Sequence, residues 1–177
     1  MIRGSASGSS TAKPLDYDAL LKAAEAALQE GGKSIMSDLK GATATWQNKP
    51  QFEIQGPFLK KQGNGSVLFI RVAPTTNVEI FEYVNNGTQP HMIFPRKGKF
   101  LSYQRDFTPK TQPWSLSSGS GGKSGPYVKR LGVTHPGIEA RMFTTLTAIN
   151  HQAWWESRVE RLATEWCLRA VGTVTAL

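Results

Sequence analysis

The sequence predicts an α+β domain in which two helices flank an antiparallel, curved sheet of about five strands. Two observations indicate this class. Apolar residues recur at helical spacing near both ends of the 177-residue chain. The part between them holds short runs of alternating apolar and polar residues, separated by turns that contain Gly, Asn and Pro.

The first helix is expected from Leu15 to about Ala44. Its apolar residues share spacings that fit one face: Leu21, Ala24, Leu28, Ile35 and Leu39. Asp16 or Asp18 is suited to cap the start. The Gly31-Gly32 pair interrupts the pattern, which predicts a kink or a split at that point.

The strands are expected to begin with a hairpin. Phe52 and Ile54 alternate with polar residues, residues 66–72 form the strongest strand pattern, and residues 63–65 supply the turn. Residues 75–88 fit either a helix or a strand and end at Gly87. Two further short strands are expected at residues 91–95 and 99–104, joined by a tight turn, and a last one at residues 127–137.

A long mobile loop is expected over residues 107–127, because this stretch has no periodicity and is rich in Gly and Ser. The final helix is expected over residues 141–171, and its stripe of apolar residues includes Ile149 and Val159. Residues 1–14 form a Gly/Ser-rich segment expected to be a flexible arm. Residues 15–171 are then a single domain that includes the loop, and residues 172–177 a tail.

Composition narrows the class of protein. A single cysteine, Cys167, excludes an internal disulfide and a cysteine-rich metal site, and its place in the last helix predicts a buried thiol. The first residues have no signal-peptide pattern, and no apolar run is long enough to span a bilayer. We expect a soluble protein made in the cytoplasm.

The net charge of +8 is concentrated. Between His91 and Arg130 the chain holds eight cationic residues against Asp106 alone, a balance of +7. Such a segment attracts polyanions, although a solvated basic loop is an equally ordinary explanation. The candidates for contact with DNA or for docking are Arg96, Lys97, Lys99, Lys110, Trp114 and Lys123. An exposed Trp114 would stack on bases or anchor a protein partner, and we favour the anchor.

Catalytic patterns are missing from the sequence. Gly122-Lys123-Ser124 imitates part of a phosphate-binding loop, but the required earlier glycine is Ser117. The three histidines, His91, His135 and His151, have no metal-ligand spacing. There is no nucleophile elbow and no activated cysteine pattern. We therefore expect no enzyme, cofactor or metal.

Two separate segments carry a family resemblance. "YVNNGTQPHMIFP" and "THPGIEARMF" contain the motif residues Tyr83, Val84, Gly87, Thr88, Pro90, His91, Ile93, Pro95, His135, Pro136, Gly137, Ala140, Arg141 and Phe143. In this order they resemble the HK97 gp10-like proteins of tailed bacteriophages, which are neck or tail-completion proteins of the head-tail connector. The resemblance covers residues 15 to 166; the Gly/Ser-rich loop and arm depart from it.

The resemblance implies a non-catalytic structural protein of the virion that forms a ring at the head-tail junction and surrounds the DNA channel. It implies as partners other copies of the chain, the portal or adaptor, tail terminator or tail-tube proteins, and the genomic DNA, with no membrane. A tail terminator, a head-completion protein or another minor tail protein remains open within this class. A free basic nucleic-acid-binding protein is the alternative from a different class.

The motif residues suit the positioning of backbone. Gly87 permits a positive φ, Pro90 and Pro95 stiffen the ends of a short strand, and Pro136-Gly137 forces a turn before the last helix. A ring would also pair the open edges of the sheet with neighbouring copies.

Overall fold

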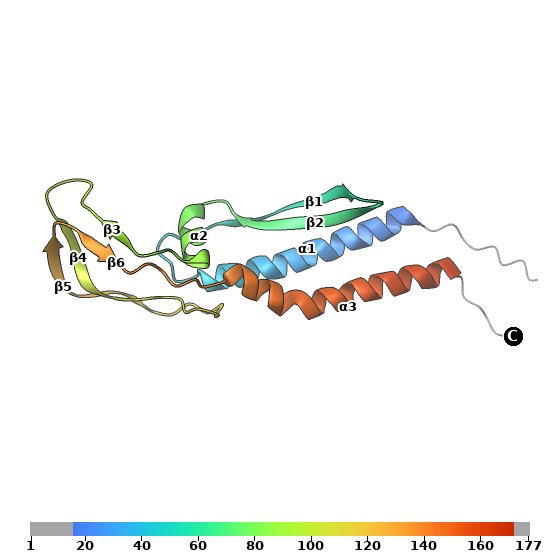
Figure 1. The fold of residues 1–177 in the computed structure, drawn as a ribbon. Helices are drawn as coiled ribbons and strands as arrows, with labels where there is room; N and C mark the ends of the chain where they lie inside the picture. Colours follow the sequence, from blue (N-terminus) through green and yellow to red (C-terminus); the bar gives the residue numbers. More distant parts are fainter. Residues whose placement is uncertain (1–15, 172–177) are drawn as a thin grey trace, which may run out of the picture.

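The computed structural model describes residues 16–171, and the expected arm at residues 1–14 and tail at residues 172–177 lie outside them. The molecule is elongated (Figure 1). The elements in chain order are α1 (Tyr17–Ala42), β1 (Phe52–Gln62), β2 (Gly65–Pro74), α2 (Val78–Asn86), β3 (His91–Ile93), β4 (Leu101–Thr108), β5 (Gly122–Arg130), β6 (Val133–His135) and α3 (Phe143–Val171). The prediction of an α+β protein is confirmed.

Three layers form one half of the molecule, which we call the helical body. Helix α1 lies between the β1–β2 hairpin on one side and α3 on the other (Figure 1). With 26 residues at about 1.5 Å per residue, α1 runs roughly 39 Å. The expectation of two helices on one sheet is therefore wrong in part: α1 covers the hairpin, but α3 packs on α1.

The start of α1 is capped as expected. The Asp16 carboxylate accepts a hydrogen bond from the backbone N–H of Ala19 at 2.9 Å, which satisfies one of the free donors of the first turn. The helix does not split at Gly31-Gly32, since α1 is continuous from Tyr17 to Ala42. Both glycines are buried, and a Cβ on Gly31 would strike the Trp155 ring of α3. A Cβ on Gly32 would meet Ile70 of the hairpin. The pair allows close packing on two sides.

The first hairpin is confirmed. Strands β1 and β2 pair antiparallel from Phe52 opposite Pro74 to Gln62 opposite Gly65, with a bulge between Gln55 and Phe58. The ambiguous segment that follows is the helix α2. Its Phe81 is only 3% exposed and stacks edge-on against Phe52. Helical spacing turns this aromatic ring toward the core. Its burial therefore favours a helix over a strand in this segment.

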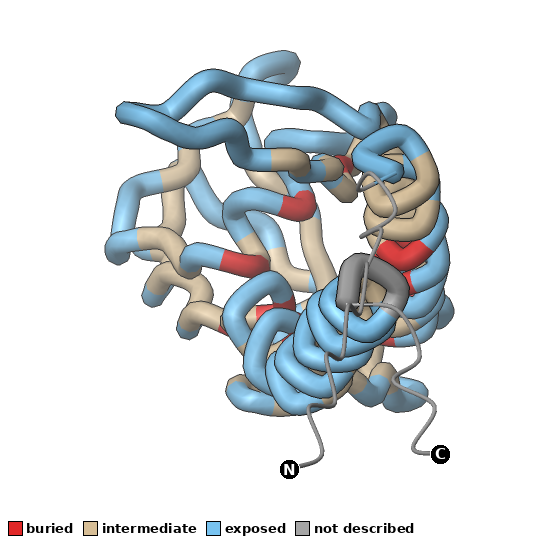
Figure 2. Tube along the Cα trace, turned by 90° about the vertical axis from the view of Figure 1, so that its right-hand side faces the viewer, coloured by how far each residue is buried: buried red, intermediate tan, exposed pale blue. Residues whose placement is uncertain are grey.

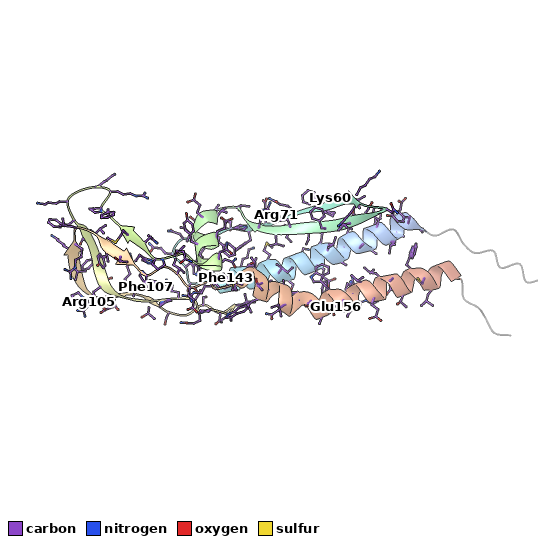
Figure 3. The ribbon with its side chains drawn as sticks, viewed as in Figure 1. Lys60, Arg71, Arg105, Phe107, Phe143 and Glu156 are labelled. Atoms are coloured by element: carbon purple, nitrogen blue, oxygen red, sulfur yellow. The ribbon has the colours of Figure 1, made fainter. Side chains whose placement is uncertain are left out.

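The core is small and lies where α1 ends, α2 begins and α3 starts. Phe143 is fully buried and packs near Phe81 and Trp46, and the same cluster holds Leu39 and Ala42. Figure 3 shows Phe143 at this junction, midway along the molecule. Viewed along the long axis, the buried segments are few and separated by partly exposed chain (Figure 2).

The strands of the described residues form three two-stranded sheets in place of the single sheet of about five strands that we expected. The hairpin is one; β3 pairs with β6, and β4 pairs with β5. The segments at residues 91–95 and 99–104 therefore do not pair with each other. Each finds its partner later in the chain, because residues 127–137 supply two strands separated by a turn at Gly132. We call residues 91–135 the distal lobe.

The expected loop at residues 107–127 is shorter in the structure. Strand β4 continues to Thr108 and β5 begins at Gly122, so the connection is residues 109–121. Gly- and Ser-rich sequence lacks side-chain periodicity, yet its backbone groups pair in a ladder as other residues do. An isolated bridge between Thr111 and Ser118 folds the remaining loop on itself.

Helix α3 contacts α1 through polar side chains and through Trp155, which belongs to the predicted apolar stripe. His151 bonds Asp38 at 2.9 Å, Arg158 lies 3.5 Å from Glu30, and Trp155 fills the space above Gly31. Ile149 and Val159 are instead 57% and 61% exposed. Cys167 is exposed as well, so the prediction of a buried thiol is wrong. Beyond its first turn, α3 packs on α1, so one face of the helix is covered.

Candidate functional site

The two motif segments lie side by side although they are about fifty residues apart in the chain. Strand β3 pairs with β6 so that His91 faces His135, Met92 faces Thr134 and Ile93 faces Val133. Next to this ladder, the backbones of Thr88 and Ile138 exchange two hydrogen bonds of 2.9 and 3.1 Å. We call the contact of residues 84–88 with residues 137–144 the clasp.

Two glycines make the clasp possible. Gly87 has a φ of +77° and Gly137 a φ of +90°, both in the region that favours glycine. A Cβ on Gly87 would lie 2.7 Å from the carbonyl oxygen of Ile138, and a Cβ on Gly137 would collide with the carbonyl oxygen of Thr88. Each motif therefore places a glycine against the backbone of the other.

The clasp also sets the start of α3. The N–H groups of Arg141 and Met142 donate to the last carbonyls of α2, on Val84 and Asn85, at 3.0 Å each. The buried Asn85 side chain accepts from the Thr144 N–H at 3.1 Å, which caps α3 from outside its own chain segment. Sequence reasoning missed Asn85, although it lies inside the first motif.

The two motif histidines stack with ring centroids 5.1 Å apart. His91 Nδ1 lies 2.9 Å from the carbonyl oxygen of Gln89, and His135 Nδ1 accepts from the Gly137 N–H at 3.1 Å. Both rings thus support the local backbone. His151 lies elsewhere, between α1 and α3. Across residues 16–171, no three His, Cys, Asp or Glu side chains converge in a way that could hold a metal ion.

The remaining motif residues vary in exposure. Tyr83 is 54% exposed on α2, Pro90 and Pro136 are exposed beside the β3–β6 ladder, and Pro95 is half-buried. Arg141 is buried; its nearest carboxylate, on Glu139, lies 3.9 Å away, and its Nε has no hydrogen-bond partner.

The basic candidates do not form one surface. Arg96, Lys97 and Lys99 lie in the loop between β3 and β4, at the end of the distal lobe remote from the helical body (Figure 1). Lys110 lies at the other end of the lobe, where its Nζ donates to the carbonyl oxygen of Thr45 at 2.7 Å. Lys123 is on β5, opposite Phe107.

Trp114 stands on a loop that is tied down. Ser118 Oγ donates to the carbonyl oxygen of Gly41 at 3.2 Å, Thr111 is 5% exposed, and Leu116 packs on the core. The indole itself is 61% exposed, and Trp114 has a φ of +57°, which is strained for a residue with a Cβ. The fixed loop thus holds Trp114 in one exposed position.

Charge divides along the molecule. The distal lobe holds eight cationic side chains and one carboxylate, on Asp106, which lies 3.2 Å from Arg105. Figure 3 shows Arg105 at this end of the molecule. Residues 16–90 and 139–168 together hold ten cationic and twelve acidic residues, a balance of −2. The lobe is therefore a strongly basic projection on a nearly neutral body.

Large apolar side chains are exposed on most elements. On the hairpin, Phe58 and Phe69 stack at 5.4 Å while 44% and 39% exposed. The total accessible surface is 13444 Å², against about 8,500 Å² for a compact protein of this mass. An elongated shape has more surface for its mass than a compact one, in agreement with the outline in Figure 1.

No family model matches the sequence, no curated protein matches it, and no solved structure matches the fold. None of the helices in the described residues is both long and apolar enough to cross a bilayer. The function proposed below depends on the motifs and on the surface of the folded chain.

Proposed function

We propose that this chain is a structural, non-catalytic subunit of a tailed bacteriophage, and that its copies form a ring in the neck, at the head-tail junction. The observation that carries the proposal is the exposed apolar surface on an elongated chain with a small core. Among residues 16–168, seven apolar residues are buried, whereas eighteen large ones are exposed. Exposed apolar side chains that contact each other, as Phe58 and Phe69 do on the hairpin, are typical of interaction surfaces.

The hairpin supports assembly between copies. Strands β1 and β2 have eleven and ten residues, and within the described part no third strand pairs with either outer edge. Long, open strand edges favour pairing with another chain. Pairing β1 of one copy with β2 of the next would build the curved sheet that the single chain lacks, and heterologous contacts of this kind close into rings.

In such a ring the apolar outer face of the hairpin would be covered by the neighbouring copy. This face carries the Phe58–Phe69 pair, and Figure 3 shows Lys60 and Arg71 on the same two strands. The neighbours would be the portal or adaptor on one side and tail terminator or tail-tube proteins on the other. A tail terminator or another minor tail protein fits the same surface.

The mass of the purified full-length chain in solution tests the proposal. We expect a ring-sized oligomer by light scattering and a ring in negative-stain images. Phe69→Ser should dissociate it, because the hairpin surface loses its central ring, whereas the matched variant Tyr127→Ser on the distal lobe should not. A wild-type chain that stays monomeric at high concentration, or its absence from purified phage particles, would contradict the proposal.

A free nucleic-acid-binding protein is the second candidate, and the charge of the distal lobe favours it. Binding of duplex DNA by a monomeric chain, with an affinity that falls steeply with salt, would support this function.

Under the ring proposal, neutralising Lys97, Lys99 and Lys123 together should reduce DNA retention in particles or docking of the ring. Fully infectious particles with full heads from that triple variant would exclude a role for these lysines.

A further inference from the structure

Two loops form the end of the distal lobe, residues 94–100 between β3 and β4 and residues 130–132 between β5 and β6 (Figure 1). They lie side by side because their strands are paired, Ile93 with Val133 and Leu101 with Arg130. A Cβ placed on Gly132 would lie 3.0 Å from the ring of Phe94. We call these two loops the tip.

The tip combines apolar and cationic side chains. Phe94, Phe100 and Leu131 are 63%, 48% and 65% exposed. The cationic side chains of the tip are Arg96, Lys97, Lys99 and Arg130, all exposed. Neither loop contains a carboxylate, and the single carboxylate of the lobe is already paired with Arg105. Within the described residues no carboxylate pairs with these four cations, and Lys99 Nζ lies 5.8 Å from the centroid of the Phe100 ring.

We propose that the tip docks on another protein, at an acidic surface that contains an apolar recess. This inference rests on the proposed function, in which the neighbour is another protein ring of the neck. It adds the chemistry of the surface on that neighbour. The partner's surface should carry acidic side chains around the contact, because the tip has four exposed cationic side chains and no acidic one between them. The partner should also have an apolar recess that receives the three apolar side chains, since such anchors contribute most binding free energy where they are fully covered.

The order of residues along the loop favours a protein over DNA. Phe94 and Phe100 lie at the base of the first loop, and Arg96, Lys97 and Lys99 lie between them toward its apex. A DNA backbone would pair with the cations and leave Phe94 and Leu131 in water. An aliphatic side chain such as Leu131 also offers no ring on which a base could stack.

The same order disfavours a membrane. Loops that enter a bilayer surface place apolar side chains deepest and keep their cations at the level of the headgroups. In the tip the apex of the first loop, Lys97-Gly98-Lys99, is charged, so Phe94 and Phe100 could enter only after the lysines. A protein surface can contact both levels at once, with carboxylates around the apex and a recess beside Leu131.

Binding of the full-length chain to defined probes tests the inference. The acidic probe is a copolymer of glutamate and tyrosine, compared with polyglutamate, a short DNA duplex, and vesicles of phosphatidylglycerol and phosphatidylcholine. Leu131→Ser removes an apolar anchor, with Val159→Ser on α3, 61% exposed, as its matched control. Lys97→Gln with Lys99→Gln removes charge, with Lys60→Gln plus Lys61→Gln on the hairpin as control.

We expect the chain to prefer the copolymer to polyglutamate. Leu131→Ser should weaken copolymer binding about tenfold and leave binding of polyglutamate and DNA unchanged. The tip lysine pair should weaken binding of every polyanion, and neither control should match these losses. Leu131 is mostly exposed, so its substitution leaves the core intact.

Three results would overturn the inference. If Leu131→Ser leaves copolymer binding unchanged, Leu131 is not an apolar anchor. Binding of DNA, but not of the copolymer, through Lys97 and Lys99 assigns the tip to nucleic acid. Binding of vesicles that is lost with Leu131→Ser assigns it to a membrane. The mass of each variant in solution is measured as well. Loss of ring assembly can then be distinguished from loss of binding at the tip.

Discussion

Replacing Gly31 with alanine tests how α1 and α3 pack. In an ordinary helix, Gly→Ala stabilises by about 0.8–1 kcal/mol, because alanine loses less conformational freedom on folding. At Gly31 the added Cβ would collide with the Trp155 ring and lie 2.9 Å from Trp154. Forcing a methyl group into a packed contact costs about 1–3 kcal/mol. The net effect should be a loss of roughly 0–2 kcal/mol in the free energy of unfolding.

The same helix supplies the control. Gly41 has no other atom within 4 Å of the position its Cβ would take. Gly41→Ala should therefore stabilise by up to about 1 kcal/mol, so the two substitutions differ in sign and by roughly 1–3 kcal/mol.

Urea unfolding followed by far-ultraviolet circular dichroism measures both values. Protein concentration must be matched between variants, since self-association adds to apparent stability. In a Trp155→Leu background the penalty at Gly31 should shrink, because the colliding ring is gone. The reasoning is refuted if Gly31→Ala stabilises as much as Gly41→Ala.

Three further substitutions test the clasp and the core. Gly137→Ala should lower thermal stability more than Gly98→Ala: both have positive φ, at +90° and +83°, but only Gly137 faces backbone; equal losses would show that φ alone matters. Asn85→Ala should destabilise by about 1–2 kcal/mol in urea unfolding, through loss of the cap on α3, and amide exchange should rise first at Thr144. Phe143→Ala should cost about 3–5 kcal/mol, a large share of a typical domain's 5–15 kcal/mol; near-native near-ultraviolet dichroism in this variant would contradict a core centred there.

Local chemistry made several features predictable from the sequence. Asp16 before an apolar-periodic run gave the helix start, and the alternation at Phe52–Gln55 with the Gly-Asn-Gly turn gave the first hairpin. Spacing along one segment carries this information, because capping and hairpin turns involve residues only a few positions apart. Positive φ at Gly87 and the turn at Gly137 belong to the same class.

Contacts between distant segments were decided by the tertiary structure. The sequence showed two motifs but not that Gly87 and Gly137 each lie against the other segment's backbone, nor that Asn85 caps α3. In the sequence the basic candidates form one continuous segment. In the fold, Lys97 and Lys99 lie at one end of the distal lobe and Lys110 lies at the other.

The exposed surfaces show the same division between local and distant information. Apolar periodicity marked Ile149 and Val159 as core, and the Gly31-Gly32 pair as a break in α1. Periodicity states which side chains share a face of a helix, but not whether a neighbour covers that face. The sequence by itself determined the two long helices, the first hairpin and the charge that each segment carries. Which faces meet was decided only by the folded chain, because burial depends on segments that come from elsewhere in the sequence.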